Sequence, residues 1–226
     1  MSGLLSNGVG SLDPPVTTQA GDLDQAWTLY LSIAYGVFAL VVLLVVYVVI
    51  RFRRRDDRLP RQKHYNIPVE IAYTVLPLVL VAVLFTITLE NLRDVEATSE
   101  TPDLTVHVVA FQWQWQFEYP ESGVVVTGGA GDDFPELVLP SDSKVLFELE
   151  SRDVIHSFWV TAFRFKRDII PGSPGRFSVD ITNSPGFYEN AGVCAEYCGL
   201  DHAMMAFSVR ILEPDDFQQW LAEAQA

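Results

Sequence analysis

Two long uncharged apolar runs constrain the fold of this 226-residue chain more than any other feature. The first, residues 26–50, has 25 consecutive positions without a formal charge, enough for about 37 Å of helix against about 30 Å of membrane hydrocarbon. The second, residues 71–89, is about as long as the bilayer core requires, and Pro77 within it predicts a kink. We therefore expect transmembrane helices at residues 26–50 and 67–90.

A short basic loop, residues 51–66, joins the two expected spans. Its bases are Arg51, Arg53, Arg54, Arg55, Arg58, Arg61 and Lys63. Loops rich in Lys and Arg stay in the cytoplasm, so both termini are predicted on the outer side of the cell membrane. The first span differs from a cleavable signal peptide because residues 1–25 contain no Lys or Arg, and we expect these residues to form an outer tail.

The negative charge of the chain is concentrated after the second span. The chain carries 29 acids and 15 bases, and residues 90–226 alone carry 23 of the acids and eight of the bases, a net charge of −15. Such a surface suits a basic partner, or a protein kept soluble in concentrated salt, which the small number of lysines also favours. It argues against nucleic acid as a partner.

Short β-rich runs separated by turn residues follow the second span. They are residues 104–119, 136–140, 144–150, 154–160, 176–182 and 205–212. Clusters of Gly, Pro and Asp between such runs are typical of an antiparallel sandwich or barrel. We expect residues 91–213 to form this all-β domain.

The last residues, 214–226, predict a short amphipathic helix on the barrel. A proline and two aspartates stand at its start, where a helix tolerates both. Apolar residues then recur at i, i+3, i+4 and i+7, at Phe217, Trp220, Leu221 and Ala224.

Soft metal-donor atoms crowd into CAEYCGLDHAMM, residues 194–205. This segment holds both cysteines, one of the four histidines and two of the three methionines. Taken alone, Cys194 and Cys198 outside the cytoplasm favour a disulfide. A disulfide leaves His202 and Met205 unexplained, whereas two thiolates, an imidazole and a thioether together favour copper over calcium or magnesium. The thioether also makes zinc less suitable, so copper is the better interpretation.

The second cysteine is one thiolate too many for a single-copper electron-transfer site. Two thiolates could instead bridge two copper ions, and each ion would then need one further imidazole. His64 lies in the basic loop, on the side of the membrane opposite to the outer domain, and His107 lies in an alternating strand, as an ordinary partly exposed histidine would. His156, in DVIHSFWV on the outer side, is the best candidate for the second imidazole, the alternative being a structural histidine.

Several motifs make the chain resemble subunit II of the haem–copper cytochrome c oxidases. They are C-x-E-x-C-x3-H-x2-M in residues 194–205, DVIHSFWV followed by KRDIIPG, AFQWQWQFEY, and EIAYTVLP at the second span. The matches cover roughly residues 26–221, in the order found in the family. The resemblance implies a membrane-anchored all-β protein, with a two-helix transmembrane hairpin, a cupredoxin-like Greek-key barrel and a short C-terminal helix.

The resemblance also implies a dinuclear copper centre, CuA. The implied ligands are His156, Cys194, Glu196 through its backbone carbonyl, Cys198, His202 and, weakly, Met205. The two thiolates would bridge the metals, and each imidazole would bind one of them. Met204, at a position that is often aromatic in relatives, is expected to be a packing residue. Where many relatives read VPAF, this chain has Val160-Thr161-Ala162-Phe163, which is expected to alter a local turn without removing a ligand.

Three further roles follow from the resemblance. Trp113 would lie exposed near the copper and receive the electron. The aromatic residues of 111–117 alternate with glutamines, which at strand period puts their rings on one sheet face, and Trp115 and Phe117 are interpreted as packing residues of that face. Glu70 would stand at the mouth of the K proton pathway, the alternative being an ordinary helix cap. The side chain of Glu196 would help to hold a magnesium ion at the boundary with subunit I.

The implied partners are oxidase subunit I, which carries the haem and reduces oxygen to water with proton pumping, and subunit III. The electron donor would be cytochrome c, or a small blue-copper protein.

Four other interpretations share part of this pattern. A CuA subunit of a nitric-oxide reductase could share the barrel, ligands and anchor, and Glu70 and the region of Trp113 favour the oxidase. A quinol-oxidase subunit II lacks the copper ligands that this chain has. A membrane-anchored copper carrier or thiol protein explains Cys194 and Cys198, but not two spans, the aromatic run and Met205 together. A nitrous-oxide reductase would need a large propeller domain for which this chain has no room.

Overall fold

The computed structural model describes residues 14–54, 63–129 and 134–225. They divide into two compact units, one of which is Asp24–Leu92, while the residues on either side of it form a second, β-rich unit. The predictions for Arg55, Arg58 and Arg61 of the basic loop, and for residues 1–13 of the expected tail, lie outside the described residues.

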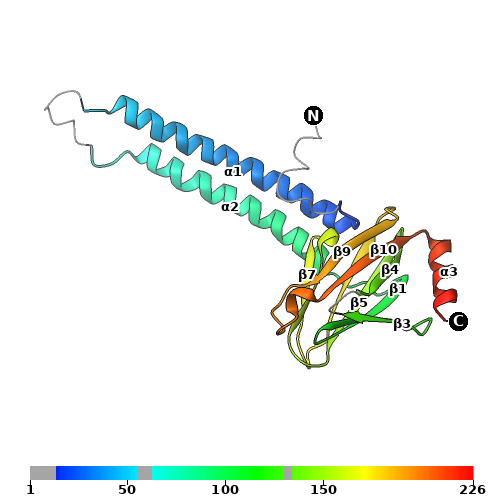
Figure 1. The fold of residues 1–226 in the computed structure, drawn as a ribbon. Coiled ribbons are helices and arrows are strands. Elements are labelled where there is room, and N and C mark those ends of the chain that lie inside the picture. The colour runs from blue at the N-terminus through cyan, green and yellow to red at the C-terminus, as the bar shows by residue number, and fades with distance from the viewer. Residues whose placement is uncertain (1–13, 55–62, 130–133, 226) are drawn as a thin grey trace. The chain divides into compact units, whose positions relative to one another are not determined.

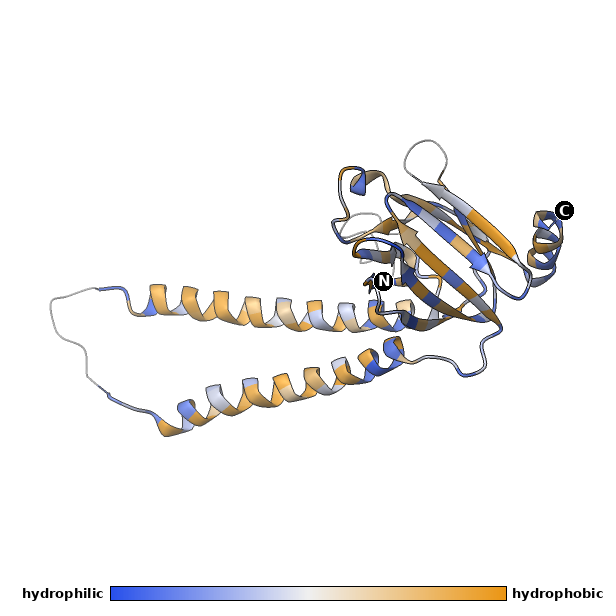
Figure 2. Cartoon of the chain, turned by 90° about the horizontal axis from the view of Figure 1, so that it is seen from below, coloured by the Kyte–Doolittle hydropathy of each residue, from blue (hydrophilic) through white to orange (hydrophobic). Residues whose placement is uncertain are grey.

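Two long helices, α1 (Thr18–Arg51) and α2 (Ile67–Glu96), contain the two apolar runs. Both are long and apolar enough to cross a membrane, and apolar residues cover most of their length in Figure 2. Helix α1 begins eight residues before the uncharged run, where the hydroxyl of Thr17 accepts a hydrogen bond from the N–H of Ala20 and caps the helix start. The hydroxyl groups of Tyr30 and Thr88 are 3.0 Å apart and link the two helices.

The β-rich unit consists of two five-stranded sheets (Figure 1). The first sheet has the order β3 (Val124–Gly129), β2 (Gln114–Tyr119), β1 (Leu104–Phe111), β5 (Ser143–Ser151) and β8 (Gly175–Ile181). The second has the order β4 (Glu136–Pro140), β10 (Ala206–Leu212), β9 (Gly186–Cys194), β6 (His156–Val160) and β7 (Phe165–Ile169). The pairs β1–β5 and β4–β10 are parallel, which corrects the expectation of a purely antiparallel domain.

Three strands, β3, β7 and β9, fall outside the β-rich runs found in the sequence. Glycine or charged residues interrupt the apolar pattern of these strands, so local propensity did not mark them. The run 104–119, by contrast, is a hairpin of β1 and β2 rather than one strand. Gln112 and Trp113 form its turn, so Trp113 does not share a strand face with Trp115.

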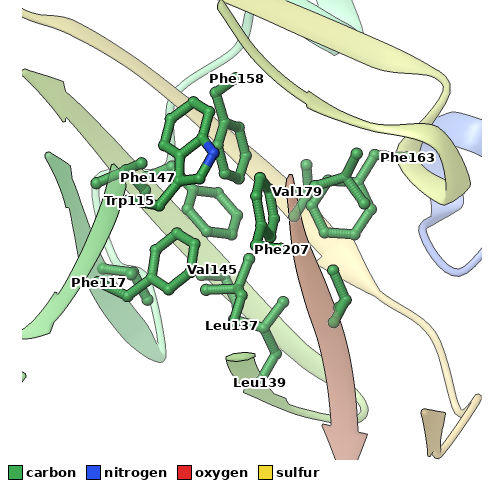
Figure 3. Packing of buried hydrophobic residues seen from close by; sticks show 14 of the residues in the cluster. Trp115, Phe117, Leu137, Leu139, Val145, Phe147, Phe158, Phe163, Val179 and Phe207 are labelled. Atoms are coloured by element: carbon green, nitrogen blue, oxygen red, sulfur yellow. The ribbon is translucent and has the colours of Figure 1, made fainter. Parts of the chain in front are cut away.

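The core lies between the two sheets and is rich in aromatic rings (Figure 3). Trp115 and Phe117 of β2 are fully buried, as their interpretation as packing residues predicted. Phe207 of β10 contacts both rings at centroid distances of 5.3 and 5.1 Å, and it stacks on Phe158 of β6 at 5.2 Å. Each large apolar side chain buried in this way contributes about 1.5–3 kcal/mol.

Helix α3 (Pro214–Ala224) follows β10 and covers one end of the sandwich. Phe217 is buried, and Trp220 contacts the ring of Tyr119 at 5.2 Å, so the predicted amphipathic helix is present. Ala224, which the pattern placed on the apolar face, is exposed because it lies in the last turn, beyond these contacts.

The residues just before α1 join the β-rich unit. The backbone N–H of Val16 donates to the carbonyl of Ala162, and the N–H of Thr182 donates to the carbonyl of Val16. Ala162 belongs to the short 3₁₀ turn η1 (Thr161–Phe163), which is where the chain departs from the VPAF pattern. The hydroxyl of Thr161 there donates to the carbonyl of Ala191 at 3.1 Å, a bond that proline could not make.

Candidate metal centre

Neighbouring strands of the second sheet bring the donor residues together. His156 is the first residue of β6, Cys194 is the last of β9, and Met205 immediately precedes β10. Because β6 and β10 both pair with β9, these ends meet at one edge of the sheet. The N–H of Cys194 donates to the carbonyl of Met205 at 3.0 Å, which holds the two ligand residues in register.

Ligand atoms of His156 and of residues 194–205 converge on the two cysteine sulfurs. The Sγ atoms of Cys194 and Cys198 are 3.8 Å apart, far beyond the roughly 2.05 Å of a disulfide bond, and both cysteines are free. The other donor distances are His156 Nδ1 to Cys194 Sγ, 3.8 Å; Glu196 O to Cys194 Sγ, 3.2 Å; His202 Nδ1 to Cys198 Sγ, 3.6 Å; and Met205 Sδ to Cys198 Sγ, 3.8 Å. All six predicted ligands are therefore in one cluster.

The cluster is buried on one side and open on the other. His156, Cys194, Cys198 and Met205 are buried. His202, in the 3₁₀ turn η2 (His202–Met204), is only half-buried. Burial excludes water from the sulfur and imidazole donors. The loop after Cys194 is the exposed side of the centre.

Asp153 orients the buried imidazole. Its Oδ1 lies 2.8 Å from Nε2 of His156, so the Nδ1 atom is the one that faces the sulfur. Although burial raises the pKa of Asp153, hydrogen bonds from the N–H of Gln112, from His156 and from the N–H of Val154 lower it overall. Burial lowers the pKa of His156, but its bonds to Cys194 and Asp153 raise it overall. A carboxylate behind a metal-binding imidazole is a common support, and sequence reasoning missed Asp153 although it lies only three residues before His156.

The two thiols differ in acidity. Burial raises the pKa of the Cys194 thiol, but His156 and the backbone of Glu196 and Ser157 lower it to about 7. Burial and the neighbouring Cys194 thiolate raise the pKa of Cys198 to about 12. Cys194 is thus the more acidic of the two thiols, and deprotonation of both would place two adjacent negative charges in the cluster, which bound cations would neutralise.

Trp113 lies against the ligand loop. Gly199, one residue after Cys198, has a φ of +125°, and a Cβ added there would come within 3.1 Å of Cζ2 and Nε1 of the Trp113 indole. The indole is partly buried, and among the described residues its N–H has no hydrogen-bond partner. The side-chain amide of Gln112 donates to the carbonyl of Cys198 at 2.7 Å, a contact that the sequence did not reveal.

Two other candidates lie elsewhere. Glu70 is in the helical unit, where its Oε1 accepts a hydrogen bond from the N–H of Asn66 at 2.8 Å and caps the start of α2. His107 is partly exposed, as expected, with Nε2 2.6 Å from Glu148. Met204, expected to be a packing residue, is instead 49% exposed, because η2 turns it away from the core.

Comparisons with known proteins agree with this architecture. The family model for the periplasmic domain of cytochrome c oxidase subunit II matches residues 132–212, and the model for its transmembrane domain matches residues 8–93. A probable cytochrome c oxidase subunit 2 of Streptomyces avermitilis is 35% identical, over 92% of this chain and 77% of that protein. The chain belongs to the cytochrome c oxidase subunit II family. It is thus a membrane-anchored component of a haem–copper terminal oxidase, an oxidoreductase that it forms with other subunits.

Further relatives of this subunit II are similar. The cytochrome c oxidase subunit 2 of Mycobacterium tuberculosis is 30% identical, over 85% of this chain and 68% of that protein. The crystal structure of the periplasmic domain of subunit II from Bradyrhizobium japonicum covers 57% of this chain and 97% of that one, with 28% identity and a TM-score of 0.52. This likeness identifies the β-rich unit as the cupredoxin-like domain of the family.

Proposed function

We propose that this subunit II accepts electrons from a soluble donor at a dinuclear copper centre, CuA. Haem in subunit I would receive these electrons and reduce oxygen to water, coupled to proton pumping. The observation that carries the proposal is the pairing of the donors around the two sulfurs. His156 lies beside Cys194, while His202 lies beside Cys198.

The spread of the ligand atoms supports two metal positions rather than one. Ligand atoms of His156, Cys194 and Cys198 all lie within 4.8 Å of one another, and this group does not extend to His202. One ion with bonds of about 2.0–2.3 Å holds its ligand atoms at most about 4.6 Å apart. Two ions that share the thiolates would use both imidazoles. The distance of His202 from the other ligand atoms also argues against a single zinc site.

The protein's contribution would be a rigid set of donors. Cys194 and Cys198 would hold the copper pair as thiolates, His156 and His202 would bind through Nδ1, and Met205 would be a weak ligand. The carbonyl of Glu196 completes the set. A bound copper pair supplies a one-electron carrier whose charge is shared by two metals. The strands that fix the donors limit their movement when the charge changes.

Copper counting with electron paramagnetic resonance tests this proposal. The full-length protein in detergent is reduced, freed of metal and then supplied with copper. We expect two copper ions per chain and a spectrum split by two equivalent copper nuclei. Cys198→Ser should lose this spectrum, whereas the control His107→Asn should keep it. One copper per chain with an ordinary one-copper spectrum would instead favour a copper carrier, and an absence of bound copper would favour a thiol protein.

We also propose Trp113 as the residue that receives the electron, since its indole lies against the loop next to Cys198. Trp113→Phe keeps an aromatic ring in the turn and should slow reduction of the complete oxidase by its donor. The copper content and spectrum should stay unchanged. Equal reduction rates in the two proteins would remove this role.

Glu70 is proposed as the entrance of a proton pathway. Because its carboxylate also caps α2, Glu70→Gln is the informative change: the amide oxygen can still accept the bond from Asn66, but the side chain no longer exchanges protons. We expect slower proton uptake by the assembled oxidase, with the copper spectrum unchanged. Glu90→Gln, near the other end of α2, is the control.

The exposed side chain of Glu196 is proposed to hold magnesium at the boundary with subunit I. Glu196→Gln should keep both copper ions, because the copper ligand is the backbone carbonyl. Substitution of Mn²⁺ for Mg²⁺ makes the site visible by paramagnetic resonance. Loss of the Mn²⁺ signal with copper retained supports the proposal, and retention of both signals contradicts it.

We propose the electron donor, and the side of the membrane on which the copper domain lies, from the distribution of charge along the chain. The net charge of −15 after the second span suits basic cytochrome c, with a small blue-copper protein as the second candidate. Arg51, Arg53, Arg54 and Lys63 flank the spans on the side proposed to be cytoplasmic, so the copper domain and both termini would lie outside the cell membrane. Oxidation of cytochrome c that slows with added salt would support the first donor, and protease access from outside the cell tests sidedness. Subunits I and III should copurify with the chain.

A further inference from the structure

The two imidazoles of the centre are supported unequally. His156 is fully buried, and Nε2 lies 2.8 Å from Asp153, which itself accepts backbone N–H bonds from Gln112 and Val154. His202 is half-buried in the turn η2, and in the described part of the chain its Nε2 has no hydrogen bond or ion pair. Ligating histidines usually gain their orientation from a partner on the second nitrogen. Among the residues that the structure describes, His202 has no such partner.

Within the described ranges, the ring that contacts His202 is that of Tyr197. The two rings meet edge to face, with their centroids 5.7 Å apart and an interplanar angle of 63°. Tyr197 lies in the ligand loop one residue before Cys198, and its side chain is 75% exposed. Among the described residues its hydroxyl has no hydrogen-bond partner. The ring, rather than the hydroxyl, is therefore what Tyr197 brings to the site.

We propose that Tyr197 is the positioning residue for His202. Its ring edge restricts rotation of the half-buried imidazole and keeps Nδ1 of His202 turned toward Cys198. Asp153 has the corresponding role for His156, whose Nδ1 it keeps turned toward Cys194. The inference deepens the proposed copper function and rests on it in part. In this proposal a carboxylate orients one imidazole of the centre, and an aromatic ring on the exposed loop orients the other.

The ring contact makes distinct predictions for three variants of the full-length protein. Tyr197→Phe keeps the ring and should behave as the unmodified protein. Tyr197→Ala removes the contact, and the bound copper should pass to a chelator roughly two- to twelvefold faster, the range expected for one aromatic pair. Leu200→Ala, at an 85% exposed position of the same loop, should change nothing.

A spectroscopic measurement separates positioning from a general loosening of the loop. Nitrogen hyperfine couplings report each bound imidazole separately. In Tyr197→Ala one histidine coupling should change while the other, from His156, stays as in the unmodified protein. Unchanged couplings and an unchanged rate of copper loss in Tyr197→Ala would overturn the proposal. So would a Tyr197→Phe variant that behaves as Tyr197→Ala.

A metal-free experiment keeps this inference distinct from the copper function. Diethylpyrocarbonate modifies accessible imidazole nitrogens, and peptide mapping assigns the modified histidine. His202 should react faster in Tyr197→Ala than in the unmodified protein or Tyr197→Phe, while buried His156 serves as the internal reference. A faster reaction in a protein that binds no copper pair would uphold the contact and reject the proposed function. Equal rates in all three proteins would reject the contact itself.

Discussion

Gln112 and Cys198, 86 residues apart in the chain, are joined by a hydrogen bond of 2.7 Å from the side-chain amide to the backbone carbonyl. The N–H of the same glutamine donates to Oδ2 of Asp153, whose other oxygen binds His156. One residue of the β1–β2 turn thus links the segment that carries the buried imidazole to the loop that carries the second thiol.

Replacing this glutamine should loosen the proposed copper ligands. Gln112→Leu keeps the size of the side chain but removes the donor to the Cys198 carbonyl, a loss of about 0.5–1.5 kcal/mol. We expect copper to pass to a chelator roughly two- to twelvefold faster. Gln114→Leu, at an exposed position two residues later, is the control. Equal rates for the two variants would contradict the role of the amide.

Asp153→Asn tests the support of the buried imidazole. The change removes the negative charge behind His156 and leaves only one oxygen for the two backbone N–H groups. Loss of such a partner typically lowers metal affinity 10–100-fold. Competition with a copper chelator measures the change, and Asp168→Asn in the neighbouring strand β7 should leave the affinity unaltered. A similar loss in both variants would point to net charge instead.

Gly192 is expected to tolerate no side chain. A Cβ at this position would lie 2.1 Å from the ring of Phe207, which is fully buried between the sheets. Gly192→Ala must therefore displace a core ring, at a cost of about 1–3 kcal/mol in the free energy of unfolding. Denaturant unfolding of the full-length protein measures this cost. Gly175→Ala, whose nearest contact is an ordinary 3.7 Å, should change stability much less.

The stability of the β-rich unit should fall at alkaline pH through Tyr119. Its hydroxyl donates to the carbonyl of Val138 and accepts from the N–H of the same residue, each at 2.9 Å. Burial, only partly offset by the Val138 backbone, raises the pKa of Tyr119 well above its ordinary value of about 10. Because the folded pKa is the higher one, the stabilisation is complete below about pH 10 and is lost as the pH rises further.

Tyr119→Phe provides the comparison. It leaves two buried backbone groups without a partner, so it should be less stable by about 1–3 kcal/mol near pH 8. The difference from the unmodified protein should shrink above about pH 10, since phenylalanine cannot ionise. Tyr188→Phe, which removes a partly buried hydroxyl bonded to the carbonyl of Ser184, is the control for the loss of a tyrosine hydroxyl. A constant difference between Tyr119→Phe and the unmodified protein at all pH values would contradict the assignment.

Local chemistry accounts for what could be predicted without a structure. The two helices follow from runs too apolar and too long for anything but a membrane or a core, and the donor segment follows from its concentration of sulfur and imidazole. The burial of Trp115 and Phe117 followed from alternation along a strand. Strands β7 and β9 were missed because charged residues or glycine break that alternation, and only pairing with β6 and β10 holds them in a sheet.

By itself the sequence predicted the membrane anchor, a β-rich outer domain and the cluster of soft donors in residues 194–205, because each depends on residues close together in the chain, whereas the cupredoxin-like class and the full ligand set were implied by the resemblance to the family. The tertiary structure decided how the donors are supported. Gln112, in the β1–β2 turn, reaches the carbonyl of Cys198 86 residues away in the chain and the carboxylate of Asp153 41 residues away. The parallel pairs β1–β5 and β4–β10 join distant segments. Contacts of this kind depend on how the whole chain packs, so no local pattern encodes them.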